Sequence, residues 1–432
     1  MNHLLDVLIQ QIAENALQNK AFLIGFSGGV DSTALLHLFA QLRQSKNIPV
    51  RAIHIHHGLS KNADDWLQHC EQICSEWQIP FISQKVLLNG TCNIEAEARA
   101  ARYQAIQQVL QPNEVLVTAH HLDDQCETFL LALKRGSGVK GLAAMPVQTT
   151  LFSVPIFRPL LTVSRTALAQ YITEHQLITI FDESNDDTRY ERNFLRKQVL
   201  PVLKQRWQHF DQAVARSAQL CAEQEQLLQE LLTPIFLTHL AADGSFTLDH
   251  FSSYSISKQR QLLRLWLAHL QQPMPSQTQL EVLLNEVVNA EADRQPELQL
   301  NARVVRRFQH KLYLTPLYQN LRDYILPIQL DEVIELPDHL GEVSCQQAQQ
   351  FAVFAWQQHQ LSIKLPENYQ QLTIRFHYSK SVQISAHSTK TEIKKVWQKL
   401  NVPAWQRTRI PLVFIDEHCC GAIGYFINYA EF

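Results

Sequence analysis

The chain has 432 residues, of which 46% are hydrophobic, so it can bury more than one core. Only 18% are charged and the net charge is −3, which excludes a protein that is basic throughout. Any contact with nucleic acid must therefore come from local basic patches. The eight cysteines are too few for this length to act as a disulfide framework, and the absence of a CxxC pair argues against a zinc ribbon. The sequence shows neither a secretory signal nor a bilayer-length apolar stretch, so we expect a cytoplasmic protein outside the membrane.

Four short apolar runs alternate with stretches of helical spacing in the first 135 residues. The run AFLIGF, which ends in glycine-rich sequence, is typical of a buried parallel strand. Strands that alternate with helices of this length predict right-handed crossovers and a parallel sheet, which binds ligands at the carboxyl ends of its strands. We expect strands at 21–26, 50–57, 81–88 and 114–121 and helices at 32–42, 62–77, 94–110 and 123–135.

The remainder of the chain changes pattern twice. Residues 136–160 are rich in glycine and proline and predict a loop, whereas 211–233 has uninterrupted helical spacing and predicts a connector helix. We expect an α/β N-terminal domain with a parallel sheet, a mostly helical α+β middle domain and a small β-rich C-terminal domain. The expected boundaries are 1–210 for the first domain, 211–235 for the connector helix, 236–330 for the middle domain and 345–432 for the C-terminal domain.

The string SGGVDS, residues 27–32, lies directly between the first expected strand and the first expected helix. Its glycines allow the backbone to approach a ligand, and the amides of the helix N-terminus form an anion site. The string lacks the spacing and the lysine of a Walker A loop. Asp31 would repel a phosphate unless a cation such as Mg²⁺ lies between them. The alternative is a glycine-rich turn with a capping Ser or Asp.

The string HHLDDQCET, residues 120–128, follows the fourth expected strand. His120, Asp124 and Glu127 share one helical face if the helix begins here, although Asp123 could instead cap the helix. These acids lie at the same sheet edge as the glycine-rich loop, where they can hold Mg²⁺ or orient an amine. A capped helix with solvated acids is the alternative, and a zinc site lacks the HExxH spacing.

Two further strings flank this edge. HIHHGL, residues 54–59, ends the second expected strand and points His54 and His56 to one face. EAEARAARY, residues 95–103, places Arg99 and Arg102 on one helical face. Structural histidines and a solvated face with a Glu95–Arg99 pair are the alternatives.

SGGVDS resembles the PP-loop of the N-type ATP pyrophosphatases, which cleave ATP between the α and β phosphates and form an adenylated intermediate. Five further strings follow within residues 20–205, and with them the chain resembles the tRNA(Ile)-lysidine synthases. A weaker match continues through RVVRRFQHKLYL and KKVWQKLNVPAWQRTRIPLVF. The five strings are HIHHGL, EARAARY, AHHLDDQCETFLLALKRGSG, RPLL and DESNDD…ERNFLR…LP.

The resemblance implies a ligase that joins L-lysine to C2 of the wobble cytidine of a tRNA(Ile) with a CAU anticodon. The implied reaction uses ATP and Mg²⁺, passes through an adenylated tRNA, and releases AMP and pyrophosphate. Its product, lysidine, changes the codon that is read from AUG to AUA. A homodimer is left open.

The resemblance also implies roles for the matching residues. Asp31 and Asp124 are expected to bind the metal, and Asp123 and Asp124 are expected to contact the lysine amine or a second metal. Which carboxylate binds metal and which binds the amine stays open. Arg192, Asn193 and Arg196 are expected to clamp the substrate. The expected catalytic residues are Asp31, His54, Arg99, His120, Asp123 and Asp124, and the expected ATP-binding residues are Ser27, Gly28, Gly29, Val30, Asp31 and Ser32.

A basic stretch near the C-terminus suits tRNA. Residues 372–411 contain eight Lys or Arg and one Glu, with Trp397 and Trp405 among them. Cations that alternate with aromatic side chains can follow a phosphate backbone and stack on bases, and we expect Lys394, Lys395 and Arg407 to contact tRNA. The alternative is a solvated basic face over a small core in which Trp397 is simply buried.

Two other functions compete with this interpretation. One is another PP-loop enzyme, such as a cytidine or uridine thiolase, which needs reactive cysteines or iron–sulfur ligands. The chain offers only a CxxxC pair at Cys70 and Cys74 and a distant Cys419–Cys420 pair. The other is a tRNA-binding protein with an inactive nucleotide site, against which the complete loop argues.

Overall fold

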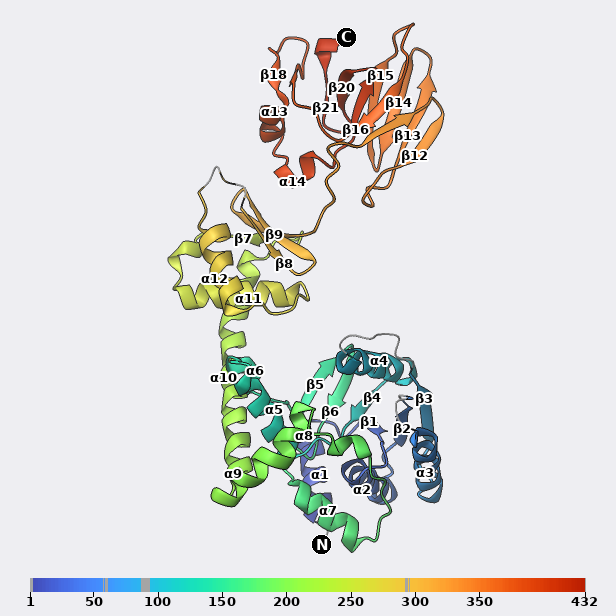
Figure 1. The fold of residues 1–432 in the computed structure, drawn as a ribbon, viewed down its shortest axis with the longest axis vertical. Helices are drawn as coiled ribbons and strands as arrows, with labels where there is room; N and C mark the ends of the chain where they lie inside the picture. The colour runs from blue at the N-terminus through green and yellow to red at the C-terminus, as the bar shows by residue number, and fades with distance from the viewer. Residues whose placement is uncertain are drawn as a thin grey trace. The chain divides into compact units, whose positions relative to one another are not determined.

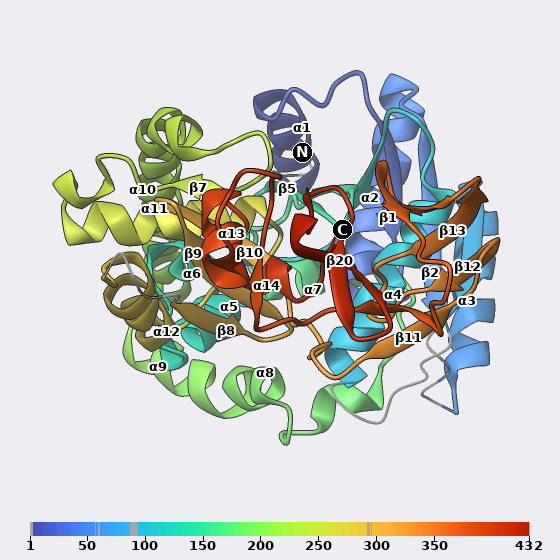
Figure 2. The same ribbon diagram turned by 90° about the horizontal axis from the view of Figure 1, so that it is seen from above.

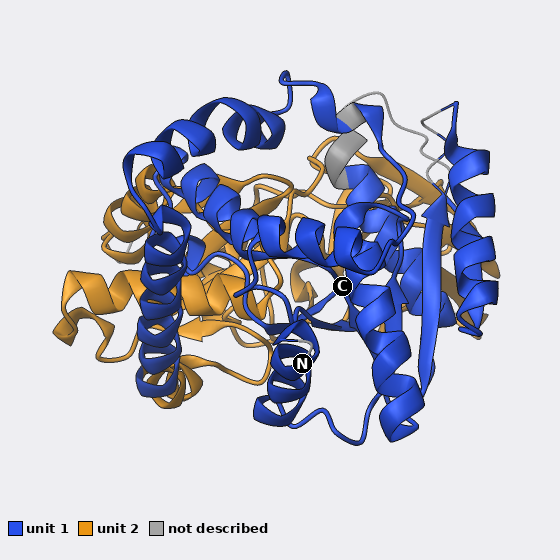
Figure 3. Cartoon of the chain, turned by 90° about the horizontal axis from the view of Figure 1, so that it is seen from below, with its two compact units in different colours: residues 1–231 blue, residues 232–432 orange. Residues whose placement is uncertain are grey.

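The computed structural model describes residues 3–56, 58, 61–86, 94–291, 294 and 296–431. The chain divides into two compact units, residues 1–231 and 232–432, and each is described here by itself (Figure 3). Across these described residues, we find no helix with both the length and the apolar character that a membrane crossing requires.

The first unit is built on a six-stranded sheet with strand order β3-β2-β1-β4-β6-β5 (Figure 1). All neighbours are parallel except β5, which pairs antiparallel with β6 at one edge. The predicted parallel sheet is therefore confirmed. Its strands are β1 (Ala21–Gly25), β2 (Val50–His56), β3 (Phe81–Lys85), β4 (Glu114–Val117), β5 (Gln148–Leu151) and β6 (Val154–Phe157).

Helices cover both faces of this sheet. Alternate side chains of β1 point to opposite faces, so Phe22 and Ile24 join one core while Leu23 joins the other. Burial on both sides explains why this strand reads as a continuous apolar run. The larger core also contains residues of α1 (His3–Glu14), α2 (Val30–Lys46), α3 (Ala63–Glu76) and α7 (Arg165–Glu174), whereas the smaller one contains residues of α4 (Ile94–Val109).

The segment 136–160 is not the loop that its glycines and prolines predict. It holds a short helix, α6 (Val139–Leu142), and the hairpin of β5 and β6 that extends the sheet. Four-residue strands are too short to show a period, and Pro155 in β6 masks the strand signal further.

Short helical pieces lead from this sheet to the second unit. α5 (Leu122–Lys134) packs through Cys126 against Leu200 and Val214. The pieces α8 and α9 follow one another along one side of the first unit (Figure 2). Their bounds are η1 (Glu183–Asp186), α8 (Glu191–Phe194), the π-helical turn η2 (Leu195–Val199), α9 (Leu200–Arg206) and the long helix α10 (Phe210–His239).

The second unit begins with helices packed on a four-stranded antiparallel sheet, order β7-β10-β9-β8. Fully buried Trp266 lies in its core and donates a hydrogen bond from Nε1 to the carbonyl of Gly244 at 3.0 Å. Its elements are β7 (Phe246–Thr247), η3 (Phe251–Ser253), α11 (Ile256–His269), α12 (Gln277–Val282), the π-helical turn η4 (Leu283–Val288), β8 (Glu297–Leu300), β9 (Arg303–Phe308) and β10 (Lys311–Pro316).

Two antiparallel sheets form the rest, with orders β11-β16-β19-β20-β21 and β12-β13-β14-β15, beside a β17-β18 pair. The boundaries expected at 330 and 345 need correction, because β11 pairs with β16 and residue 345 lies inside β13. The elements are β11 (Ile325–Ile328), β12 (Glu332–Glu335), β13 (Glu342–Ala348), β14 (Phe351–Trp356), β15 (His359–Lys364), β16 (Leu372–Arg375), β17 (Ser381–Val382), β18 (Thr391–Glu392), α13 (Ile393–Lys399), α14 (Ala404–Arg407), β19 (Leu412–Ile415), β20 (His418–Ala422), β21 (Phe426–Ile427) and η5 (Tyr429–Glu431).

Candidate active site

The glycine-rich loop connects β1 to α2, whose N-cap is Gly29. The Ser32 hydroxyl donates to the Gly29 carbonyl at 3.1 Å and accepts from the Ser27 amide at 3.2 Å. The Thr33 hydroxyl donates to the Gly28 carbonyl at 3.1 Å. These bonds fix the loop in the shape that turns the amides of the helix N-terminus outward, as an anion site requires.

Gly28 is required for this shape. Its φ of +80° lies in the left-handed region, and a Cβ there would lie 2.5 Å from the Cδ1 of Ile180. The Ile180 amide in turn donates to the Gly28 carbonyl at 2.9 Å. The segment after α7 therefore packs directly on the loop, and only glycine fits between them.

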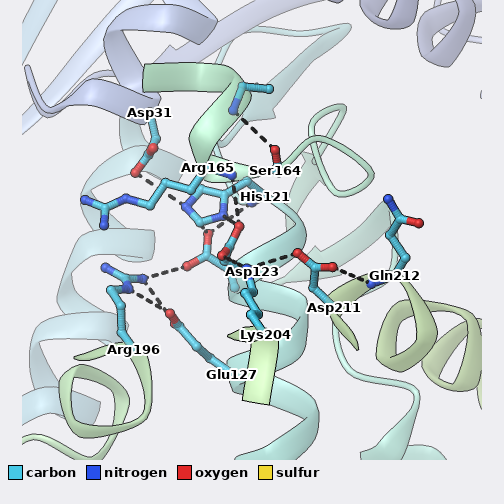
Figure 4. Close-up of polar contacts among 12 residues, drawn as sticks. Asp31, His121, Asp123, Glu127, Ser164, Arg165, Arg196, Lys204, Asp211 and Gln212 are labelled. Atoms are coloured by element: carbon cyan, nitrogen blue, oxygen red, sulfur yellow. Dashed lines mark hydrogen bonds and ion pairs between the residues drawn. The ribbon is translucent and has the colours of Figure 1, made fainter. Parts of the chain in front are cut away.

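His121 is the centre of a cluster of carboxylates beside this loop. The imidazole is fully buried, and its Nε2 lies 3.6 Å from Asp31 Oδ2 and 3.4 Å from Asp124 Oδ2 (Figure 4). Its Nδ1 lies 3.8 Å from Asp123 Oδ2. The three acids that the sequence predicted at one sheet edge are thus brought together around a single imidazole.

The charged groups in this cluster shift one another's pKa values. Burial opposes the protonation of His121, but the neighbouring Asp31, Asp124 and Asp123 outweigh it and raise the pKa of the imidazole. Burial likewise acts to raise the pKa of Asp31, but His121 and the more distant arginines lower it overall. The pair of His121 and Asp31 thus favours an imidazolium beside an ionised carboxylate.

Arg196 fills the space between two acids of α5. Its Nε donates to Glu127 Oε1 at 2.7 Å, and its Nη2 donates to Asp124 Oδ1 at 3.0 Å (Figure 4). Glu127 is fully buried, and burial raises the pKa of its carboxyl although Arg196 opposes the shift. The Asp124–Glu127 pair, which we call the diacid pair, is therefore a binding place for a cation with several N–H groups.

Asp123 makes different contacts from Asp124. It accepts a hydrogen bond from the Arg165 amide at the start of α7, at 2.9 Å, and forms an ion pair with Lys204. Lys204 also pairs with Asp211 at 2.9 Å (Figure 4). Asp123 thus ties α5 to α7 and α9. It is not the N-cap of α5, because that position is His121, whose amide donates to Asp124 at 3.0 Å.

Histidines flank the loop as the sequence predicted, but they are engaged by the protein. His54 is buried at the end of β2 and its Nδ1 lies 2.9 Å from the Phe26 carbonyl, just before the loop. His120 precedes α5 and does not lie on its face, and its Nδ1 lies 2.8 Å from Thr118 Oγ1. Burial, helped by the charges of Arg158 and other arginines, lowers the pKa of His120 to about 4.

Arg99 is exposed on α4, where its guanidinium lies 5.4 Å from the centre of the Tyr103 ring. Of the substrate clamp, Arg192 donates to Thr128 Oγ1 at 3.1 Å and Asn193 donates to the Asp187 carbonyl at 3.0 Å. Arg192 and Arg196 thus both contact residues of α5. His57 and the Glu95 side chain lie outside the described residues.

The basic stretch 372–411 is less open than its composition predicts. Arg375 pairs with Glu417, Arg409 pairs with Asp338, and Arg407 donates to the Val402 carbonyl at 2.9 Å. Trp397 is buried, as expected if it serves the core rather than RNA. The ring of Trp405 packs on the rings of Phe308 and Tyr313. Exposed cations remain along α13 and before it, namely Lys380, Lys390, Lys394, Lys395 and Lys399.

Two contributors to the cluster were not predicted as site residues. His121 stands inside the string HHLDDQCET, whose strand-to-helix switch was the available signal. Lys204 lies 81 residues after Asp123, and nothing in its local sequence predicts that contact.

The residues around Asp31 suit a divalent cation. Asp31 Oδ1 is buried and finds no hydrogen-bond partner in the part of the chain that the structure describes. Asp31 Oδ2 and Asp124 Oδ2 both face the same imidazole nitrogen. Mg²⁺ typically takes one or two carboxylates and completes its shell with water and phosphate oxygens, so this donor set fits.

Comparison with known proteins matches three stretches of the chain to family models. Residues 1–203 match the family described as the PP-loop domain. Residues 246–313 match the TilS substrate binding domain, and 372–431 match the TilS substrate C-terminal domain. A tRNA(Ile)-lysidine synthase of Histophilus somni (strain 129Pt) is 49% identical over 98% of this chain and 99% of its own length.

The chain belongs to the tRNA(Ile)-lysidine synthase family. Relatives of that name from Haemophilus influenzae (strain PittEE) and Serratia proteamaculans (strain 568) are 49% and 45% identical over 96% and 98% of this chain. They are matched over 96% and 95% of their own length, so the family likeness spans both units. A solved U34-tRNA thiolase of Methanococcus maripaludis is 16% identical over 51% of this chain and 78% of its own, with a TM-score of 0.42.

Proposed function

We propose that this chain ligates L-lysine to C2 of the wobble cytidine of a tRNA(Ile) with a CAU anticodon. The reaction consumes ATP, passes through an adenylated tRNA and yields lysidine, AMP and pyrophosphate, so that the anticodon reads AUA in place of AUG. The observation that carries the proposal is the meeting of the glycine-rich loop and the diacid pair around His121. The family likeness over both units supports it.

The first step concerns the leaving group. The oxygen at C2 of cytidine leaves poorly, and attack of that oxygen on the α phosphate of ATP converts it into the oxygen of AMP. Ser27, Gly28, Gly29 and Ser32 bind the departing pyrophosphate through amides and hydroxyls. Asp31 would hold Mg²⁺, which would supply charge neutralisation at the phosphates.

The second step concerns the amine. We assign the diacid pair to the ε-ammonium of lysine, which presents the same kind of donors and would have to displace the guanidinium of Arg196 that holds both carboxylates in the structure. The ammonium must lose a proton before it attacks C2. Glu127 can accept that proton because burial raises the pKa of its carboxyl. The new bond joins nitrogen to C2, and the bond from C2 to the AMP oxygen breaks.

The second unit is assigned to tRNA. Its exposed lysines along α13 suit the phosphate backbone, whereas the arginines of the same stretch hold the fold together. We expect the reaction in the cytoplasm, with Lys394 and Lys395 in contact with tRNA. A homodimer is not needed for any step.

The thiolase alternative is not favoured by the cysteines. Burial raises the pKa of the Cys70, Cys74 and Cys126 thiols to about 12, which suppresses the reactive thiolate. Cys70 lies against the glycine-rich loop, as its Sγ would be 3.2 Å from a Cβ at Gly28. A thiol at that place serves packing.

One incubation tests the reaction, the amine and the tRNA together. The protein is mixed with ATP, Mg²⁺, labelled lysine and transcripts of several tRNAs, and the RNA is digested to nucleosides. Label in a cytidine derivative of the CAU tRNA(Ile) alone is expected. Without lysine, AMP should accumulate on the tRNA. In a parallel reaction with lysine but without tRNA, formation of an AMP–lysine adduct would overturn the order of steps.

A further inference from the structure

A groove of about 640 Å³ lies in the first unit, between α5 and residues 188–199. Its apolar lining includes Leu130, Leu133, Phe194 and Leu195, and its polar lining includes Lys134 and Arg189. We call it the α5–α8 groove. Leu133 is 55% exposed and Phe194 is 40% exposed. Large apolar side chains gathered in a concave surface, rather than scattered singly, indicate a binding site.

The groove continues the catalytic cluster along the same two elements. Arg192 and Arg196 contact Thr128, Glu127 and Asp124, while the neighbouring Phe194 and Leu195 line the groove. Along α5, Leu131 follows Glu127 by four residues, a rise of about 6 Å. An occupant of the groove therefore lies next to the place proposed for the reacting cytidine and the lysine amine.

The chemistry of the lining favours a base rather than a bare phosphate. The two cations of the lining are each held by an acid, because Lys134 pairs with Glu191 at 2.6 Å and Arg189 pairs with Asp187 at 2.7 Å. The floor is apolar and carries the aromatic ring of Phe194. An apolar floor with an aromatic ring suits the flat face of an unpaired base.

We propose that the α5–α8 groove binds one unpaired base of the substrate RNA, next to the reacting cytidine in the anticodon loop. The proposal rests on the proposed function and adds a base-binding subsite to it. Single-stranded loops are read by bases that leave the stack and lie against aromatic or apolar side chains. An apolar or acidic peptide in the groove is the competing occupant.

Transcripts that each lack one base of the anticodon loop test the proposal. With the wild-type protein, one missing base should weaken tRNA binding on the order of tenfold, the size of a lost base–aromatic stack. Phe194→Ala should weaken the binding of intact tRNA by a similar factor. In that variant, removal of the same base should reduce the affinity little further. The control is Leu227→Ala, an equally apolar residue of α10 that is 49% exposed outside the groove.

The proposal would be overturned if, for every base removed, the loss of affinity in Phe194→Ala equalled the product of the two separate losses. Such independence would show that Phe194 contacts none of these bases. Bound ATP and the unfolding temperature show whether Phe194→Ala is folded. If it is not, Leu133→Glu and Leu133→Lys give the answer: only the glutamate should weaken tRNA binding, and equal effects would contradict an RNA occupant. A wild-type protein that binds tRNA but forms no lysidine would instead refute the proposed function and leave this binding test intact.

Discussion

Two concentrations of charge in this chain are built in opposite ways. Around His121 the charged side chains are buried or partly buried, close to one another and paired across α2, α5 and η2 before any ligand arrives. In residues 372–411 the arginines are tied into the fold and the lysines of α13 face solvent. The first arrangement fixes geometry for chemistry, whereas the second supplies attraction that salt screens.

The sharpest test of the buried cluster is Asp31→Ala. It removes a carboxylate that faces His121 and that we assign to Mg²⁺, so the rate of lysidine formation should fall by about a hundredfold or more. Binding of tRNA should stay within about twofold because the lysines are untouched. Asp65→Ala, an exposed acid of α3, serves as the control. Near-normal turnover of Asp31→Ala would refute the assignment.

The loop beside the cluster depends on shape more than on charge. Gly28→Ala combines a left-handed backbone with a Cβ 2.5 Å from Ile180, so we expect a loss of about 2–4 kcal/mol of unfolding free energy. Gly136 has a similar φ, but open space surrounds it. Gly136→Ala should therefore lower the free energy of unfolding by only about 1–2 kcal/mol. Urea unfolding measures both. Ile180→Ala should restore part of the loss in Gly28→Ala, and no restoration would contradict the clash.

The partly buried imidazole of His37 makes the stability of the first unit depend on pH. Burial and the nearby His175 lower the pKa of His37 to about 4, and its Nδ1 lies 2.7 Å from the Tyr171 hydroxyl. Because the folded-state pKa is lowered, the stability is complete above the unfolded pKa of about 6.5 and is lost as the pH falls toward 4. Urea unfolding should show a loss of about 1–2 kcal/mol between pH 7 and 4.5. His37→Gln should flatten that dependence, and an unchanged slope would show that other groups cause it.

The smallest effect is expected at the exposed lysines. Lys394→Ala with Lys395→Ala should weaken tRNA binding about 3- to 10-fold and lower the salt slope by about two. The rate at saturating tRNA should not change. Arg375→Ala is the contrast, because losing its pair with Glu417 should lower the unfolding temperature and leave the slope alone. A slope unchanged by the lysine variant would show that this face is only a solvated surface.

The sequence by itself predicted the parallel sheet, the glycine-rich loop and the acids of HHLDDQCET, because these depend on local periods and on residues close in the chain. It failed at β5 and β6, whose four residues each are too few to show a period, and at the sheet that begins with β11.

Only the tertiary structure decided which charges meet. Arg196 reaches the diacid pair from 69 and 72 residues away, and Lys204 reaches Asp123 from 81. Such contacts depend on how α8, η2 and α9 pack against α5, and no local pattern specifies that packing. The same holds for the arginines of 372–411, because burial against distant partners, and not their number, decides whether a cation binds RNA or stabilises the fold.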